Sequence, residues 1–131
     1  MESATQAAPV SKGMRWTGII LSALPIVILF LAAAFPFINP AAAAQGNAHM
    51  GYPANTGVLI SVLAAGCAIL YAIPRTSVLG AVLITGYLGG ATASHIRIGE
   101  APIAPLVVAA FVWLGIYLRE PRLRALLPVR K

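Results

Sequence analysis

The sequence lacks aspartate altogether and has three glutamates, Glu2, Glu100 and Glu120. The long apolar stretches that precede Glu100 therefore hold no carboxylate with which to bind a cation or couple transport to protons. Small multidrug-type antiporters are four-helix proteins of similar length, and the familiar ones use a membrane-embedded Glu in the first helix. The absence of acidic residues argues against that class of transporter.

Cysteine is almost absent as well, because Cys67 is the only one in 131 residues. A single thiol excludes an internal disulfide and the cysteine pair of a disulfide–quinone oxidoreductase. Buried haem needs two facing axial ligands, which the apolar stretches do not supply. Cys67 is expected to act as a small apolar residue facing away from the helix-packing side. No catalytic residue is assigned, and whether the protein is an enzyme stays open.

Charge of either sign is scarce: 9% of the residues are charged and 60% are hydrophobic. Soluble domains carry about a quarter charged residues. The few basic residues lie mostly between or beyond the apolar stretches, so the net charge of +6 describes flanks rather than a nucleic-acid surface. The composition predicts an integral membrane protein whose main partner is the lipid bilayer, with no nucleic acid bound.

Four apolar segments, at about 16–38, 57–73, 77–96 and 102–118, predict the fold class: an all-α membrane protein built as a bundle of four transmembrane helices. They form one domain over residues 15–118, between a flexible tail at 1–14 and a basic tail at 119–131. The stretch from Asn39 to Thr56 is predicted to be a loop with at most a short turn through Ala41 to Ala44. Ser77, after a Pro-Arg turn, is the predicted N-cap of the third helix.

The distribution of basic residues predicts the orientation. Eight of nine fall in the amino tail, the turn between the second and third helices, and the carboxyl tail, against Arg97 alone elsewhere. By the positive-inside rule these segments are cytoplasmic, which requires an even number of crossings. We therefore expect a multi-pass protein of the inner (cytoplasmic) cell membrane with both termini inside. In the alternative interpretation, residues 1–44 are a cleaved signal peptide. The apolar core of this segment has 23 residues, however, whereas the hydrophobic region of a signal peptide usually has about 7 to 15.

Small residues recur at helical spacing in the second and third segments. Such residues let helices approach closely in lipid, so a packing face is predicted, with a ligand groove as the alternative. The residues assigned to packing are Gly57, Ser61, Ala65, Gly86, Gly90 and Ser94.

Polar side chains gather at the predicted outer end of the third helix. A pocket for a small molecule or a quinone head is one interpretation, and interfacial anchoring is the other. Thr85 and Thr92 share a face with Gly89 between them, and their hydroxyls are free to bond a facing helix or a ligand. The candidate ligand-binding residues are Tyr52, Thr85, Tyr87, Gly89, Thr92, His95 and Arg97. His49, Met50 and His95 suggest a soft copper site, but their spacing matches no metal motif and no metal site is predicted.

The run LYAIPRTSVLGAVLITGYLGGATASHIR at residues 70–97 resembles the DoxX-like family of small bacterial membrane proteins. The resemblance implies a four-helix membrane bundle and an association with redox complexes, since the family is named after a subunit of a thiosulfate:quinone oxidoreductase. It carries over no catalytic residues. Three hypotheses stay open: an accessory, quinone-contacting subunit of a membrane oxidoreductase; a structural or ligand-binding membrane protein without a redox role; and a small transporter. Association into a homo-oligomer stays open as well.

Overall fold

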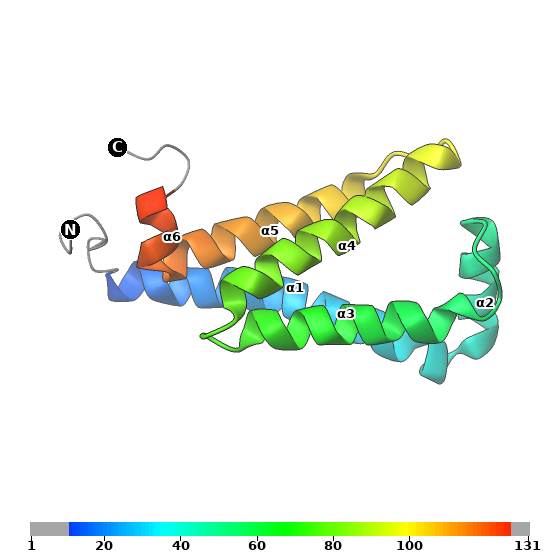
Figure 1. The fold of residues 1–131 in the computed structure, drawn as a ribbon, viewed down its shortest axis with the longest axis horizontal. Coiled ribbons are helices and arrows are strands. Elements are labelled where there is room, and N and C mark those ends of the chain that lie inside the picture. The colour runs from blue at the N-terminus through cyan, green and yellow to red at the C-terminus, as the bar shows by residue number, and fades with distance from the viewer. Residues whose placement is uncertain (1–10, 127–131) are drawn as a thin grey trace.

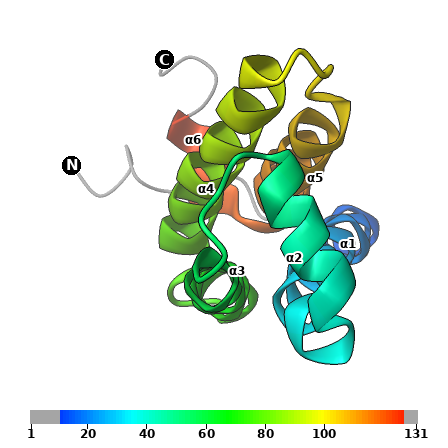
Figure 2. The ribbon, with the colours of Figure 1, turned by 90° about the vertical axis from the view of Figure 1, so that its right-hand side faces the viewer.

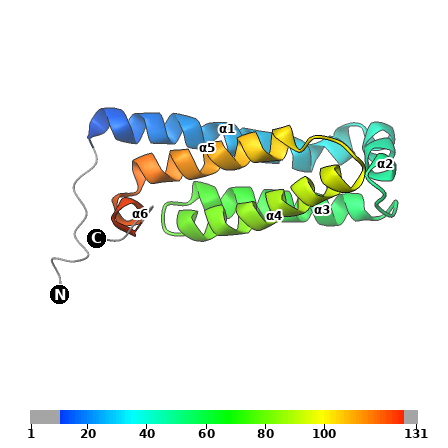
Figure 3. The same ribbon diagram turned by 90° about the horizontal axis from the view of Figure 1, so that it is seen from above.

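The computed structural model describes residues 11–126, which form helices and turns without a strand in that range. The helices are α1 (Lys12–Ile38), α2 (Pro40–His49), α3 (Thr56–Ala72), α4 (Ser77–Arg97), α5 (Ile103–Arg119) and α6 (Pro121–Leu126) (Figure 1). The long helices α1, α3, α4 and α5 form a bundle, and the short α2 lies across one end of it (Figures 2 and 3).

Neighbouring helices in the bundle follow a ring. α1 packs against α3 and α5, and α4 packs against the same two helices, so α1 and α4 lie on a diagonal. We call the end with the start of α1, the α3–α4 turn and α6 the α6 end, and the end with α2 and the α4–α5 connection the α2 end. The basic residues at the described α6 end are Lys12, Arg15, Arg75, Arg119, Arg122 and Arg124, whereas Arg97 lies at the α2 end.

The outward surface of the helices is apolar. α1, with 27 residues, and α4, with 21, are each long and apolar enough to cross a membrane, whereas α3 and α5 are apolar but have 17 residues each. Seventeen residues span about 26 Å, slightly less than a hydrocarbon core of about 30 Å. Large apolar side chains point away from the bundle, among them Trp16, Ile20, Leu31, Phe37 and Ile38, each more than 60% exposed. Lipid, rather than water, suits such a surface.

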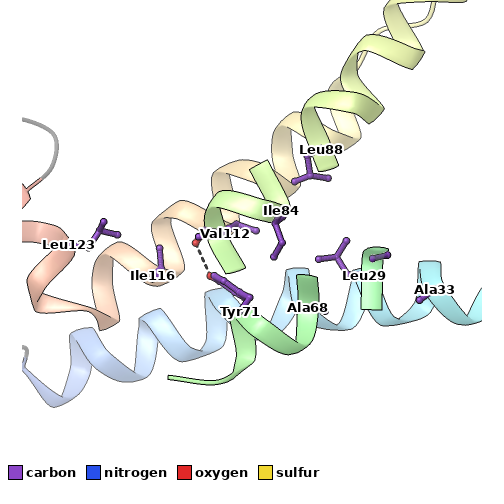
Figure 4. Packing of buried hydrophobic residues seen from close by; sticks show 11 residues of the cluster. Leu29, Ala33, Ala68, Tyr71, Ile84, Leu88, Val112, Ile116 and Leu123 are labelled. Atoms are coloured by element: carbon purple, nitrogen blue, oxygen red, sulfur yellow. Dashed lines mark hydrogen bonds between the residues drawn. The ribbon is translucent and has the colours of Figure 1, made fainter. Parts of the chain in front are cut away.

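The buried core is made largely of small and branched side chains (Figure 4). Ala64 and Ala68 of α3 and Ala81 of α4 are fully buried, which lets these helices approach their neighbours closely. The other apolar members are Leu29, Ala33, Tyr71, Ile84, Leu88, Val112, Ile116 and Leu123.

Tyr71 is the largest fully buried side chain, and its hydroxyl joins three helices. It donates to the Val112 carbonyl of α5 at 2.7 Å (Figure 4). It also lies 3.0 Å from Ser22 Oγ of α1. Its own carbonyl accepts from the Arg119 guanidinium at 3.0 Å, and that guanidinium also lies 4.8 Å from the centre of the Tyr71 ring. Tyr71 therefore fixes α3 against α1 and α5 near the α6 end.

We expect Tyr71→Phe to lower the free energy of unfolding by about 1 kcal/mol, because it removes one buried hydrogen bond and leaves Ser22 with one partner fewer. Thermal unfolding in detergent measures the change. Tyr117→Phe is the matched control, because the Tyr117 hydroxyl makes no hydrogen bond within residues 11–126. Equal stability of the two variants would contradict this role of Tyr71.

Two local predictions from the sequence are wrong. The stretch from Asn39 is not a loop, because α2 occupies Pro40–His49: the Asn39 side chain accepts from Ala42 N at 3.2 Å, and Pro40 stands at the first helical position, where its missing N–H costs nothing. Ser77 is not an N-cap. It is the first residue of α4, and its hydroxyl donates backwards to the Pro74 carbonyl at 3.0 Å.

The predicted flexible amino tail differs from the structure over the few residues of it that the structure describes. α1 already begins at Lys12, with Ser11 Oγ accepting from Met14 N at 3.2 Å. The carboxyl tail contains α6, whose Leu123 is buried against the bundle. Residues 1–10 and 127–131 of the two predicted tails lie outside the described residues.

Candidate functional site

α3 and α4 meet tightly at their connecting turn and separate toward the α2 end (Figures 1 and 2). At the turn, a Cβ on Gly80 would lie within 3.0 Å of the backbone of Leu70 and Tyr71. Farther along α4, a Cβ on Gly86 or Gly90 would meet no atom within 4 Å. Glycine thus gives close contact near the turn and open space farther away from it.

The open space is a groove between α3 and α4 that has two adjoining parts. The part at the α2 end has a volume of about 470 Å³, and the part nearer the turn about 550 Å³. Leu63, Gly86 and Tyr87 line both parts, so the two are continuous. We call them the polar part and the apolar part of the α3–α4 groove.

The polar part combines an apolar wall with polar groups at the α2 end. Leu59, Ile60 and Leu63 of α3 form the wall. The polar lining residues are Asn47, Tyr52, Thr56, Tyr87, Ser94 and His95. The apolar part, in contrast, is lined almost entirely by apolar side chains and glycine, together with Cys67. Polarity therefore changes along the groove, from the α2 end toward the middle of the bundle.

His95 presents one ring nitrogen that is free within the described residues. Its Nδ1 lies 2.8 Å from the Ala91 carbonyl, which can only accept, so Nδ1 carries the hydrogen. In the neutral ring Nε2 is then an acceptor. The Tyr87 hydroxyl makes no hydrogen bond within residues 11–126 and is available as a donor. The groove thus offers a donor and an acceptor to a bound molecule.

Contacts from the α2–α3 connection hold the polar part in place. The Tyr52 hydroxyl bonds Ser94 Oγ, and Arg97 donates to the Met50 carbonyl while lying 5.8 Å from the centre of the Tyr52 ring. Gly51 has φ +78°, a conformation that suits glycine, and a Cβ there would lie 3.3 Å from the Arg97 guanidinium. These contacts tie the segment after α2 to the end of α4.

An ion pair closes the same end. His49 Nε2 lies 2.5 Å from Glu100 Oε1, which connects the end of α2 to the α4–α5 connection. Both side chains are well exposed, so the pair contributes at most about 1 kcal/mol to stability. It joins the end of α2, whose Asn47 lines the groove, to the α4–α5 connection.

The candidate ligand residues fall into two groups. Tyr52, Tyr87 and His95 line the groove. Arg97 does not line it and holds the Met50 carbonyl instead. Thr85 accepts from Trp113 Nε1 of α5 at 2.8 Å, and the Thr92 hydroxyl donates to the Leu88 carbonyl at 2.8 Å. Thr85, Thr92 and Gly89 do not line either part, so the structure does not bring them to the groove.

The small residues assigned to helix packing also divide. Gly86, Gly90 and Ser94 line the groove instead of closing it, because α4 has moved away from α3 at their level. A Cβ on Gly57 would meet Asn47 of α2 at 3.4 Å and Pro36 of α1 at 4.0 Å, so Gly57 faces those helices and not α4.

The remaining small residues of α3 lie at the core. Ser61 is buried, with no partner for its hydroxyl in the described chain, and Ala65 packs at the edge of the core. Cys67, expected to point away from the packing side, lines the apolar part of the groove together with Leu63 and Leu70 of the same helix.

Sequence reasoning missed the glycines that make close helix contacts. A Cβ on Gly18 of α1 would lie 2.8 Å from the Gly115 carbonyl, and a Cβ on Gly115 would lie 2.9 Å from Ser22 N. With Gly80, these residues bring α1 against α5 and α3 against α4. Gly18 and Ser22 are spaced four residues apart, so small-residue spacing could have indicated the α1 contact face. Gly80 and Gly115 could have been indicated only by their helical phase relative to Tyr71 and Ser22.

A metal centre finds no support in the described residues. No group of three His, Cys, Asp or Glu side chains comes together within residues 11–126. Met50 and His95 do line the same part of the groove, but His49 is paired with Glu100 instead.

The apolar outer surface, the helical bundle and the groove are those of a membrane protein that has room for a small molecule between two helices. The chain belongs to the DoxX-like family, whose model matches residues 20–115. No curated protein and no solved structure matches it.

Proposed function

We propose that the protein binds a membrane-soluble amphipathic molecule in the α3–α4 groove, with a quinone as the preferred ligand. The observation that carries this proposal is the continuity of the polar and apolar parts, which share Leu63, Gly86 and Tyr87. A ligand with a polar head and an apolar tail matches that change of polarity. Each part also falls within the range of about 300–1,000 Å³ that is usual for small-molecule sites.

The chemistry of the polar part suits a quinone head. A quinone carbonyl accepts hydrogen bonds, and the Tyr87 hydroxyl is a free donor within the described residues. A quinol hydroxyl donates, and Nε2 of neutral His95 accepts. The isoprenoid tail would lie along the apolar part beside Cys67 and Leu70. The site can thus hold both the oxidised and the reduced form.

Binding of a quinone supports a role as an accessory, quinone-contacting subunit of a membrane redox system. Such a subunit is expected to co-purify with an oxidoreductase when its native membrane is dissolved in mild detergent. Retention of quinone without any oxidoreductase would favour the alternative, a ligand-binding membrane protein with no redox role.

Thermal unfolding of the full chain in detergent tests the ligand itself. A short-tailed ubiquinone is expected to raise the midpoint, and an isoprenoid alcohol of the same tail length to raise it less. Tyr87→Phe, which removes only the donor, should weaken quinone binding about five- to tenfold, with Tyr117→Phe as the unaffected control. Equal protection by quinone and alcohol, unchanged by Tyr87→Phe, would reject the quinone proposal.

We further propose that all four long helices cross the bacterial inner membrane, with the α6 end in the cytoplasm. The grouping of basic residues at that end supports this orientation. α3 and α5 are short by only a few ångströms, a mismatch that tilting neighbours and local bilayer thinning accommodate.

Single cysteines placed in a Cys67→Ser background test the orientation. A membrane-impermeant maleimide added to spheroplasts is expected to label Gln45→Cys, which lies on exposed α2, and to spare Arg75→Cys in the exposed α3–α4 turn until the cells are lysed. Labelling of both positions, or of Arg75→Cys alone, would contradict four crossings with the α6 end inside.

A further inference from the structure

A second cavity, separate from the groove, lies at the α6 end. It has a volume of about 470 Å³ and lies among the first part of α1, the end of α3, the start of α4 and the end of α5. Its polar lining residues are Arg15, Ser22, Ser77, Arg119 and Glu120. Ile19 and Ile26 of α1 supply an apolar side. Four helices thus enclose a mixed polar and apolar space that contains two arginines.

Arg119 lies in the cavity wall, and its guanidinium has N–H groups that make no hydrogen bond within the described residues. Its guanidinium donates to the Tyr71 carbonyl at 3.0 Å and stacks on the Tyr71 ring at 4.8 Å. Its Nε is buried and has no partner among the described residues. No carboxylate lies within salt-bridge distance of Arg119 in the described chain. A guanidinium that is held in one orientation and has unused N–H groups can bind an anion through them.

Arg15 adds a second positive charge to the cavity lining. Its side chain is exposed and makes no hydrogen bond or ion pair within residues 11–126. Glu120 is the one acid in the lining, and its Oε1 accepts from the Arg122 backbone N–H at 3.1 Å rather than pairing with either arginine. Two arginines against one glutamate leave the cavity with a net charge of +1.

The start of α4 adds backbone donors to the same wall. α4 has 21 residues, and Thr76 at its N-cap position makes no side-chain cap hydrogen bond. The first N–H groups of a helix lack partners within the helix and favour an anion. Ser77, the first residue of α4, lines the cavity. The wall therefore joins two guanidinium groups to an uncapped helix start.

We propose that this cavity binds a phosphate group, held by Arg15 and Arg119, and that the phosphate belongs to the headgroup of an anionic phospholipid. The apolar side formed by Ile19 and Ile26 suits the start of an acyl chain. A soluble phosphate compound carries the same phosphate group but has no acyl chain to pack against that apolar side. The site differs from general attraction to a basic surface because it depends on Arg15 and not on every basic residue at the α6 end.

Native mass spectrometry of the full chain, released from nanodiscs that hold equal amounts of phosphatidylglycerol and phosphatidylcholine, tests the proposal. The wild-type protein is expected to retain phosphatidylglycerol in preference. Arg15→Gln should lower that retention about five- to tenfold, the value of one charge-assisted contact. Arg75→Gln is the matched control, because Arg75 is exposed at the same end and does not line the cavity. It should change retention less than twofold or so.

The outcomes are distinct. The Arg15 side chain makes no hydrogen bond or ion pair within residues 11–126, so Arg15→Gln is expected to leave the fold intact. Arg119→Gln also removes the bond to the Tyr71 carbonyl and serves only as a second measurement. Inorganic phosphate or glycerol phosphate that displaces the lipid at millimolar concentration would assign the same site to a soluble phosphate. Equal loss of lipid in Arg15→Gln and Arg75→Gln, or no preference over phosphatidylcholine in the wild type, would overturn the proposal.

Discussion

Replacing Gly90 by Leu is expected to weaken ligand retention at least tenfold or so, with little change in the stability of the empty protein. Gly90 lines the polar part of the groove, and a Cβ there meets no atom within 4 Å, so the longer side chain enters the groove and not a neighbouring helix. It would occupy space needed by the ligand head beside Tyr87 and His95. Titration of the purified protein with a short-tailed ubiquinone, followed by thermal shift, measures the loss.

Gly89→Leu is the matched control for this experiment. Gly89 is the preceding residue of α4, is equally open, and lines neither part of the groove. Its replacement should leave binding within about twofold of the wild type. Equal loss in both variants would mean that leucine harms α4 generally, and unchanged binding in Gly90→Leu would place the ligand elsewhere.

Replacing Gly80 by Ala is expected to destabilise the protein by about 3 kcal/mol, which is large for the addition of one methyl group. The new Cβ would lie within 3.0 Å of backbone atoms of Leu70 and Tyr71, and backbone cannot rotate out of the way as a flexible side chain can. The α3–α4 turn would have to open, which would also disturb the contacts of Tyr71 with α1 and α5.

Gly86→Ala, two turns along the same helix, provides the comparison for Gly80→Ala. Its Cβ meets nothing within 4 Å, so the change should be neutral or stabilising by about 0.5–1 kcal/mol through helix propensity. Both free energies of unfolding follow from denaturant titration in mixed micelles. A Gly80→Ala variant as stable as Gly86→Ala would show that the close approach at the turn does not exist in solution.

The long helices and their approximate bounds could be predicted from the sequence, because the length of an apolar run is a property of each segment and does not depend on its neighbours in the fold. Hydropathy marked all four. The structure moves seven of their eight ends by no more than one residue, and it begins α1 four residues earlier, at Lys12. α2 was missed because its mean hydropathy is low and because its glycine and asparagine, with Asn39 before it, indicated a loop. What makes it a helix is local chemistry at its start, where Asn39 caps and Pro40 begins it.

Only part of the candidate site could be predicted from the sequence. Tyr52, Tyr87 and His95 were proposed from the sequence because they carry polar groups, which is a property of the residues themselves, and all three line the groove. Tyr87 lies in the middle of α4 and not at its end. The sequence could not show that Gly86 and Gly90 line open space instead of a helix contact, because a glycine that allows contact and a glycine that leaves space look identical in sequence. The angle between α3 and α4 separates the two cases, and that angle depends on Gly80, Tyr71 and the helices behind them.

Photo-crosslinking tests the central claim, the binding of an amphipathic quinone along the α3–α4 groove, most directly. A quinone with a diazirine at the end of its tail, irradiated with the protein in membranes and mapped by peptide mass spectrometry, is expected to label the residues that line the apolar part, within 62–70 and 82–87. Excess unlabelled quinone should suppress that labelling. Labelling spread over the exposed faces of α1 and α5, and insensitive to unlabelled quinone, would contradict the account.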